Sequence, residues 1–197
     1  MAVAAVVFDV GETLVDESRA WLEIAERAGV PAFTLLGVLG GLAARRADHR
    51  DVWPLLDAPP TPSPPIELRD FYPDALPCLE RLRARGLVLG LAGNQPESAA
   101  VDLARCGLEA DLLATSAGWG VEKPSPAFFE RISAELGLPP ERIAYVGDRV
   151  DNDVEPALAA GMTAVHLRRG PWGFLHEAPA AARRIRSLDE LPEALDG

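Results

Sequence analysis

The sequence predicts an α/β fold, in which helices cover both faces of a parallel β-sheet and a small helical segment is inserted after the first strand. The run Ala2–Phe8 holds seven consecutive apolar residues, which is typical of a central strand that is buried on both faces. From Pro73 onward, short apolar runs alternate with amphipathic helical stretches. This alternation indicates βαβ units with right-handed crossovers, and therefore a parallel sheet.

The composition is that of a globular protein with a packed core. The chain has 197 residues, of which 48% are hydrophobic and 25% charged, and this length suits one domain with a modest insertion. The net charge of -11 argues against nucleic-acid binding, because that function needs basic residues clustered on one face. An acidic chain can still bind phosphate where it offers a local cation.

The sequence carries no signal for export and no membrane segment. No apolar stretch reaches the length that a bilayer requires, and the amino terminus lacks the basic region and the cleavage site of a secretory signal. Cys78 and Cys106 are too few for a disulfide framework or a zinc knuckle, and the three histidines lack metal-ligand spacing. We therefore expect a cytoplasmic protein with core thiols and with no membrane or nucleic-acid partner. Whether it forms a homodimer stays open.

Residues 15–72 are expected to form the insertion. Helical spacing of apolar residues predicts a helix over 17–28 that ends at Gly29, and a second helix over 31–46 that begins with a proline in its first turn. The stretch 57–65 is rich in proline and can form neither a helix nor a central strand. We interpret it as a stiff linker back to the sheet.

The core elements follow the insertion in regular alternation. Helices are expected to end at Gly86, Gly107 and Gly137, because glycine readily takes the left-handed conformation at the residue after a helix. A last helix near the carboxyl terminus is expected to pack on the edge of the sheet. The expected helices span residues 74–85, 96–106, 126–136, 153–160 and 188–195, and the expected later strands span 87–92, 112–114, 143–146 and 163–167.

Polar residues follow the predicted strands where each strand ends. In open parallel sheets, ligands bind beyond the carboxyl ends of the strands, so these residues are candidates for a site. Asp9 taken alone is explained equally well as a turn-capping residue, because aspartate is common in that role. The presence of three more such stretches favours a site. The four stretches are Asp9 after the first strand, Gly93-Asn94 after the second, Glu122-Lys123-Pro124 ahead of a helix, and Gly147-Asp148 through Asp153 after a late strand.

The order of these four stretches resembles the haloacid dehalogenase (HAD) superfamily of hydrolases, and the resemblance covers nearly the whole chain. It implies a Rossmann-like core domain formed by residues 1–14 and 73–197. Residues 15–72 then stand at the position of the helical cap that covers the site in the superfamily, with the proline-rich linker at its end. This cap is expected to be small, with two or three helices.

The resemblance also implies the chemistry of the site. Asp9 matches the nucleophile, which forms an aspartyl-phosphate. Asp9, the backbone carbonyl of Gly11 and Asp148 match the ligands of a Mg²⁺ cofactor, which prefers oxygen donors. Asp153 matches a second acid, which supports the metal or the lysine. Lys123, the only lysine of the chain, matches the cation that offsets charge on the nucleophile and the phosphate.

The sequence departs from the phosphatases of the superfamily at two positions. Those enzymes carry an aspartate two residues after the nucleophile, which protonates the leaving group and then activates water, and here that position is Gly11. The sequence leaves open whether Glu12 substitutes, and an aspartate introduced at position 11 is expected to raise turnover. The second departure is Gly93, in place of a serine or threonine that binds the phosphoryl group. The backbone amides of Gly93 and Asn94, or the Asn94 side chain, are the expected substrate-binding groups.

These residues predict Mg²⁺-dependent hydrolysis of a small phosphorylated metabolite, with low activity because of the two departures. One alternative is a 2-haloacid dehalogenase, in which Gly11 is no defect because halide leaves without a proton, although the acids Asp148 and Asp153 then have no metal to hold. Another alternative is a non-catalytic descendant that binds a phosphorylated metabolite or a protein partner. A phosphonate-cleaving enzyme with a Schiff-base lysine in its cap is excluded, because residues 15–72 contain no lysine.

Overall fold

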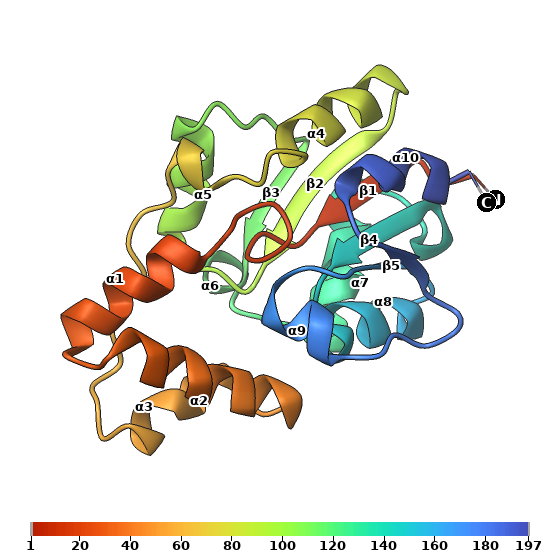
Figure 1. Ribbon diagram of the computed structural model, residues 1–197. Coiled ribbons are helices and arrows are strands. Elements are labelled where there is room, and N and C mark those ends of the chain that lie inside the picture. The colour runs from red at the N-terminus through yellow and green to blue at the C-terminus, as the bar shows by residue number, and fades with distance from the viewer. Residues whose placement is uncertain (1, 197) are drawn as a thin grey trace.

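Figure 1 shows the computed structural model of the protein, which describes residues 2–196. Six strands form one parallel sheet in the order β3-β2-β1-β4-β5-β6. The first strand lies inside the sheet, as its unbroken apolar run predicts, and the expected α/β fold with a Rossmann-like sheet is confirmed. The strands are β1 (Ala5–Phe8), β2 (Val88–Gly93), β3 (Leu112–Thr115), β4 (Ile143–Gly147), β5 (Thr163–Leu167) and β6 (Arg183–Ile185).

Separate apolar cores lie under the two faces of the sheet, because neighbouring residues of a strand point to opposite faces. In β1, Val6 and Phe8 join one core, whereas Ala5 and Val7 join the other. Helices cover both cores (Figure 1). The first core is covered by α4 (Ala75–Ala84), α5 (Ser98–Arg105) and α10 (Leu191–Ala194), and the second by α7 (Pro126–Leu136) and α8 (Glu155–Ala159).

The insertion after β1 forms three helices, within the two or three expected. They pack around an apolar cluster of their own, which includes Ile24 and Leu35. The proline-rich stretch that follows has no helix or strand from 58 to 67. This separate cluster supports a division into a cap and a core domain, which we keep as a proposal. The three helices are α1 (Ser18–Ala28), α2 (Ala32–Ala44) and α3 (Val52–Leu55).

Most element boundaries follow the predictions, and the exceptions have local causes. Where a helix was expected over 153–160, the chain first forms a π-helical turn, Val150–Val154, and then α8. The strand β6 was missed because two of its three residues are arginines, so it carries no apolar run. The short helices α6 (Ser116–Trp119) and α9 (Gly170–Leu175) were also missed. The last helix, α10, packs beside α4 and the edge strand β6, where a helix was expected. The remaining short elements are 3₁₀ turns at His49–Asp51, Leu68–Asp70, Pro140–Arg142 and Leu188–Glu190.

Both cysteines are free, with Cys78 buried and Cys106 partly buried. Burial raises the pKa of both thiols, so neither is a ready nucleophile at neutral pH. Across residues 2–196, no single helix has the length and the apolar composition to cross a membrane. The pair α1 and α2 passes that test jointly, by length and composition only, and its two helices are bent by 117° at their junction.

Candidate active site

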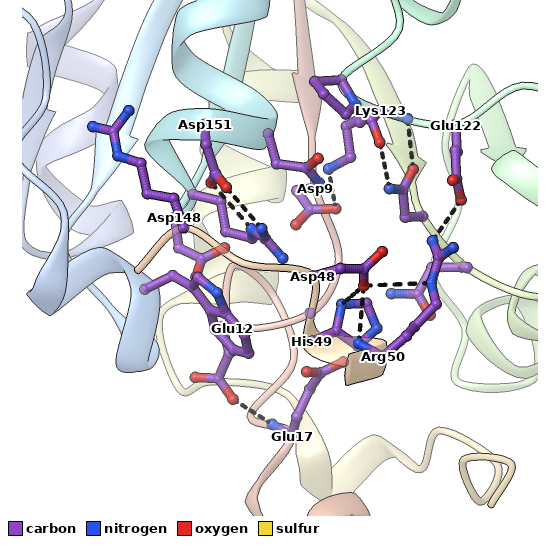
Figure 2. Close-up of a pocket in the computed structure, with 18 of the residues that line it drawn as sticks. Asp9, Glu12, Glu17, Asp48, His49, Arg50, Glu122, Lys123, Asp148 and Asp151 are labelled. Carbon is purple, nitrogen blue, oxygen red and sulfur yellow. Dashed lines mark hydrogen bonds and ion pairs between the residues drawn. The ribbon is translucent and has the colours of Figure 1, made fainter. Parts of the chain in front are cut away.

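The residues that follow β1, β2 and β4 lie together at the carboxyl edge of the sheet, where they line an open cleft of about 620 Å³. Figure 2 shows this cleft, with Asp9 and Lys123 side by side. The insertion lines the same cleft through Glu17, just before α1, and through the turn that carries His49. The structure therefore brings the separate stretches predicted from sequence to one place, although their roles stay predictions.

Lys123 is buried between two carboxylates. Its Nζ lies 2.8 Å from Oδ1 of Asp9 and 2.5 Å from Oδ1 of Asp153, and its side chain is only 1% exposed. The ring of Tyr145 lies near the ammonium, 5.4 Å from Nζ to the ring centroid. Burial alone would lower the pKa of Lys123, but the charges of Asp153 and Asp9 raise this pKa well above its ordinary value. The Lys123 side chain therefore stays protonated and positively charged beside Asp9 at neutral pH.

The loop of Lys123 is positioned by Asn94, which follows β2. The Asn94 Nδ2 donates a hydrogen bond to the Lys123 carbonyl at 2.9 Å, and the Lys123 backbone N–H donates to Asn94 Oδ1 at 2.8 Å. The Asn94 side chain is thus engaged in holding the lysine loop. The expected contact with a phosphoryl group then rests on the backbone amides of Gly93 and Asn94, and it stays a prediction.

Gly93 lies against the carboxylate of Asp9. A Cβ atom at position 93 would stand 2.6 Å from Oδ1 of Asp9, closer than side-chain atoms pack. A serine or threonine at position 93 would therefore require the Asp9 carboxylate to shift from the position that it has in this structure.

Asp9, Asp148 and Asp153 form a buried acid cluster, with one oxygen of each within 4.8 Å of the others. Oδ2 of Asp148 is buried without a hydrogen-bond partner in the described chain. Burial, together with the charges of Asp153 and Asp9, raises the pKa of Asp148 well above its ordinary value. Burial also raises the pKa of Asp153 to about 6, against the opposing effect of Lys123. One ammonium does not compensate three buried carboxylates, so the cluster suits a further cation.

The π-helical turn after β4 brings Asp153 back toward the end of that strand. A Cβ atom at Gly147 would stand 2.6 Å from the Cβ of Asp153, so this approach requires glycine. The Asp153 Oδ2 accepts a hydrogen bond of 2.9 Å from the backbone N–H of Arg149. The other oxygen of Asp153 remains for Lys123.

Glu12, which the sequence left open as a substitute acid, is held by other groups. It adopts a left-handed backbone conformation, with φ of +52°. Its Oε2 accepts a hydrogen bond of 2.8 Å from the hydroxyl of Tyr72, and its Oε1 accepts one of 3.0 Å from the backbone N–H of Glu17. Both carboxylate oxygens of Glu12 therefore already accept a hydrogen bond within the protein.

Glu17 was not singled out by sequence analysis, which treated it only as the start of a helix. A Cβ atom built on Gly11 would lie 2.7 Å from Cδ of Glu17. Trp21 Nε1 donates a hydrogen bond of 3.3 Å to Glu17 Oε2. Burial, with added repulsion from the charges of Glu12 and Asp9, raises the pKa of Glu17 to about 7. No spacing in the sequence relates Glu17 to Gly11, because their contact depends on how the chain turns into α1.

The insertion is also joined to the core beside the cleft. Arg50 Nη2 lies 2.7 Å from Oε2 of Glu122, next to Lys123 (Figure 2). At the end of α2, the carbonyl of Ala43 lies 2.7 Å from Nε2 of the buried His176. Neither contact could be predicted from the sequence, because each joins residues far apart in the chain.

One arginine and two tryptophans near these stretches are engaged in packing. Arg149 forms an ion pair with Asp151, with 2.9 Å between Nη2 and Oδ2, and its guanidinium lies 5.2 Å from the ring of Trp172. Trp119 packs edge-on against Phe128, with 5.2 Å between ring centroids. Trp172 lines the cleft, whereas Trp119 belongs to the core under α7.

Comparison with known proteins supports the class that the fold indicates, which is a hydrolase. A profile of the haloacid dehalogenase-like hydrolases matches residues 64–161. The chain is 41% identical over 108 residues to a glyceraldehyde 3-phosphate phosphatase of Methanopyrus kandleri, covering 51% of this chain and 45% of that protein. It is 37% identical over 122 residues to a phosphoserine phosphatase of Thermus thermophilus, covering 60% of this chain and 48% of that protein. The chain thus spans about half the length of these relatives.

Solved structures share this fold over the whole length of the chain. A HAD phosphatase from Thermococcus onnurineus shares the fold with a TM-score of 0.67 and 26% identity, covering 100% of this chain and 99% of that one. The HAD-hydrolase YfnB of Bacillus subtilis has a TM-score of 0.73 at 16% identity, with both chains fully covered, and this likeness concerns the fold alone. The chain belongs to the haloacid dehalogenase superfamily of hydrolases, as the resemblance in its sequence indicated.

Proposed function

We propose that the chain hydrolyses phosphate esters of small metabolites in a Mg²⁺-dependent reaction, with Asp9 as the nucleophile. The observation that carries this proposal is the place of the Asp9 carboxylate, which shares one buried cluster with the Lys123 ammonium and the unpartnered oxygen of Asp148. The phosphatases among the relatives support the same reaction class. Because the chain spans about half of each relative, the substrate is proposed as a class only.

The acid cluster fits a Mg²⁺ ion. Mg²⁺ prefers oxygen ligands, and Oδ2 of Asp148 is a buried oxygen that lacks a partner within residues 2–196. In this proposal, Asp9, Asp148 and the backbone carbonyl of Gly11 hold the ion. When bound, it supplies positive charge that offsets the charge of the nucleophile and of the phosphoryl group.

The residues of the cleft then have separate tasks. The Asp9 carboxylate attacks phosphorus and forms a phosphoryl–aspartate bond, while the bond from phosphorus to the leaving oxygen breaks. Lys123 offsets charge on Asp9 and on the phosphoryl oxygens, and Asp153 holds the ammonium in place. The backbone amides of Gly93 and Asn94 bind phosphoryl oxygens. Water then cleaves the phosphoryl–aspartate bond, which releases phosphate and restores Asp9.

The insertion limits which molecules reach Asp9. Its turn with His49 and Arg50 lines a cleft of about 620 Å³, a volume that suits a small metabolite. We propose that residues 15–72 act as this cap. We also place the reaction in the cytoplasm, a proposal supported by the two free cysteines.

The test is a screen of phosphorylated metabolites with wild-type protein and with Asp9→Asn, each in Mg²⁺ and in EDTA. We expect wild-type protein to release phosphate in Mg²⁺. The variant should lose on the order of 10³-fold or more in kcat, because an amide does not attack phosphorus. Asp189→Asn is the matched control, since Asp189 is 61% exposed and pairs with Arg81 on the surface, and it should keep the wild-type rate.

Other results would favour the alternatives. Halide release from a 2-haloacid in EDTA would point to a dehalogenase. Mg²⁺-dependent binding of a phosphorylated metabolite without turnover would point to a non-catalytic protein. Phosphate release that survives Asp9→Asn would overturn the proposed role of Asp9.

A further inference from the structure

We propose that Glu17 supplies the general acid and base of this cleft, a function for which the loop after β1 offers no side chain at Gly11. This inference rests on the proposed hydrolysis of phosphate esters. It assigns a catalytic role to a residue that enters the cleft from the insertion and not from the loop of the nucleophile.

The Glu17 carboxyl group lies against Gly11. A Cβ atom built on Gly11 would lie 2.7 Å from Cδ and 3.2 Å from Oε2 of Glu17, so the Glu17 carboxyl group occupies the space in which a side chain at position 11 would begin. Position 11 is two residues from Asp9. Asp9, Gly11 and Glu17 all line the same cleft. The carboxyl group of Glu17 therefore lies where it can reach an oxygen that leaves the phosphorus attacked by Asp9.

Each of the other carboxyl groups that line the cleft has a partner or another proposed task. Glu12 accepts hydrogen bonds on both oxygens. Asp148, whose Oδ2 has no hydrogen-bond partner in the described chain, lies in the acid cluster beside Asp9, where the proposed function assigns it to Mg²⁺. By contrast, Glu17 forms no salt bridge with any residue that the structure describes, and its side-chain hydrogen bond is the one that Trp21 donates to Oε2. The remaining acids are paired with cations, Asp48 and Glu122 with Arg50, and Asp151 with Arg149.

Two hydrogen bonds position Glu17. Trp21 lies one helical turn after Glu17, and its indole N–H donates to Oε2 at 3.3 Å. The backbone N–H of Glu17 donates to Glu12 Oε1 at 3.0 Å, which fixes the start of the helix relative to the loop after β1. The bond from Trp21 thus holds one oxygen of the Glu17 side chain at the edge of the cleft that this residue lines, and Oε1 is left for a substrate or for water.

The proton balance of the reaction is then complete. As Asp9 attacks phosphorus and the bond to the leaving oxygen breaks, the Glu17 carboxyl group gives its proton to that oxygen, and an alcohol departs. The Glu17 carboxylate next takes a proton from the water that attacks the phosphoryl–aspartate. The bond between phosphorus and the Asp9 oxygen breaks, phosphate leaves, and both carboxyl groups return to their starting states.

The proposal changes the expected effect of an aspartate at position 11. Gly11→Asp alone places its Cβ against the Glu17 carboxyl group, so this variant should be less stable than wild type and should not gain activity. Gly11→Asp combined with Glu17→Ala removes that overlap and restores an acid to the same space. The double variant should recover activity that Glu17→Ala alone has lost.

The experiment measures kcat/KM for two phosphate monoesters that differ in leaving group, an alkyl phosphate and p-nitrophenyl phosphate. Glu17→Gln should lower kcat/KM by about 10²–10³-fold for the alkyl ester, which needs a proton on its leaving oxygen. The loss should be under about 10-fold for the p-nitrophenyl ester, whose leaving group is stable as an anion. Glu26→Gln, an exposed residue of the same helix, is the matched control and should change neither value.

A second measurement does not depend on turnover. Thermal unfolding of wild type, Gly11→Asp, Glu17→Ala and the double variant forms a double-mutant cycle. Gly11→Asp should lower the Tm more in the presence of Glu17 than in its absence. Effects that simply add would show that the two positions do not share space, and would overturn the proposal.

The kinetic outcomes separate this inference from the proposed function. Equal losses for both esters in Glu17→Gln would indicate a structural role and would overturn the acid–base role, with the phosphatase reaction intact. A wild-type protein that releases phosphate in Mg²⁺ from neither ester and from no metabolite of the screen would overturn the proposed function and the acid–base role together. In that case the unfolding cycle still decides where the Glu17 carboxyl group lies.

Discussion

Lys123 stands in a space that has no room for a larger cation. Its Nζ lies 2.8 Å from Asp9 and 2.5 Å from Asp153, and its side chain is almost fully buried. An arginine would place a planar guanidinium where the two carboxylates now meet one compact ammonium. This geometry gives a physical reason for the single lysine in a chain whose other long cationic side chains are all arginines.

Lys123→Arg should therefore lower kcat/KM by at least about 10²-fold, because the larger group displaces Asp9 from the cleft. Steady-state kinetics on a substrate found in the metabolite screen would measure this loss. Arg131→Lys, an exchange at a 41% exposed helix position, is the control and should keep the wild-type value. Activity within about threefold of wild type in Lys123→Arg would contradict the requirement for a compact cation.

At the scale of elements, a bidentate ion pair fixes the start of α1. Arg19 donates from Nε and Nη2 to the two oxygens of Asp70, at 2.7 Å and 2.6 Å. Asp70 is buried, and its hydrogen bonds with Arg19 lower its pKa. The backbone N–H of Asp16 also donates to the Asp70 carbonyl at 2.7 Å. The two ends of the insertion are thus tied together beside Glu17.

Arg19→Ala should reduce the free energy of unfolding by about 2 kcal/mol, because it leaves the Asp70 carboxylate buried and unpaired. For a chain of this length, that corresponds to a Tm lower by roughly 4–8 °C. Arg69→Ala is the control, since Arg69 is 69% exposed and pairs with Glu67 at the surface, and its effect should stay below about 0.5 kcal/mol. Calorimetry that finds equal losses would show that the pair does not anchor α1.

At the scale of the whole molecule, negative charge is concentrated in the cleft of a chain that already carries a net charge of -11. Burial raises the pKa of Glu17 from 4.5 to about 7, with added repulsion from Glu12 and Asp9. The folded state therefore binds a proton at Glu17 that the unfolded state has lost between these two values. Stability from this group is present at low pH and falls as pH rises through about 7.

In EDTA, Glu17→Gln should match wild type in stability at pH 5 and exceed it at pH 8.5 by about 1–3 kcal/mol. The reason is that the amide stays neutral where the wild-type carboxyl group must ionise. Urea unfolding at both pH values, with Glu26→Gln as the control, measures the difference. A gain at pH 5 equal to that at pH 8.5 would contradict the raised pKa.

Elements whose sequence signals lie within one stretch of the chain could be predicted, whereas elements that depend on pairing with distant residues could not. Helix α7 spans Pro126–Leu136 as expected, because a first-turn proline, helical spacing and a terminal glycine all lie within one stretch. Strand β5 likewise spans Thr163–Leu167 as expected. The strand Arg183–Ile185 was missed, because it pairs only with β5 at the edge of the sheet, and no pattern within three residues reports that pairing.

The sequence by itself determined the α/β fold, the superfamily and the stretches that follow the strands at the cleft. Asp9 and Asp148 follow from sequence because parallel strands bring their carboxyl ends to one edge. Lys123, which lies in a loop held by Asn94, was indicated by the resemblance to the superfamily. Only the tertiary structure decided which acid stands beside Gly11. That acid is Glu17 and not the adjacent Glu12, because the way the chain turns into α1 and the hydrogen bond from Tyr72 to Glu12 are set by contacts between distant residues.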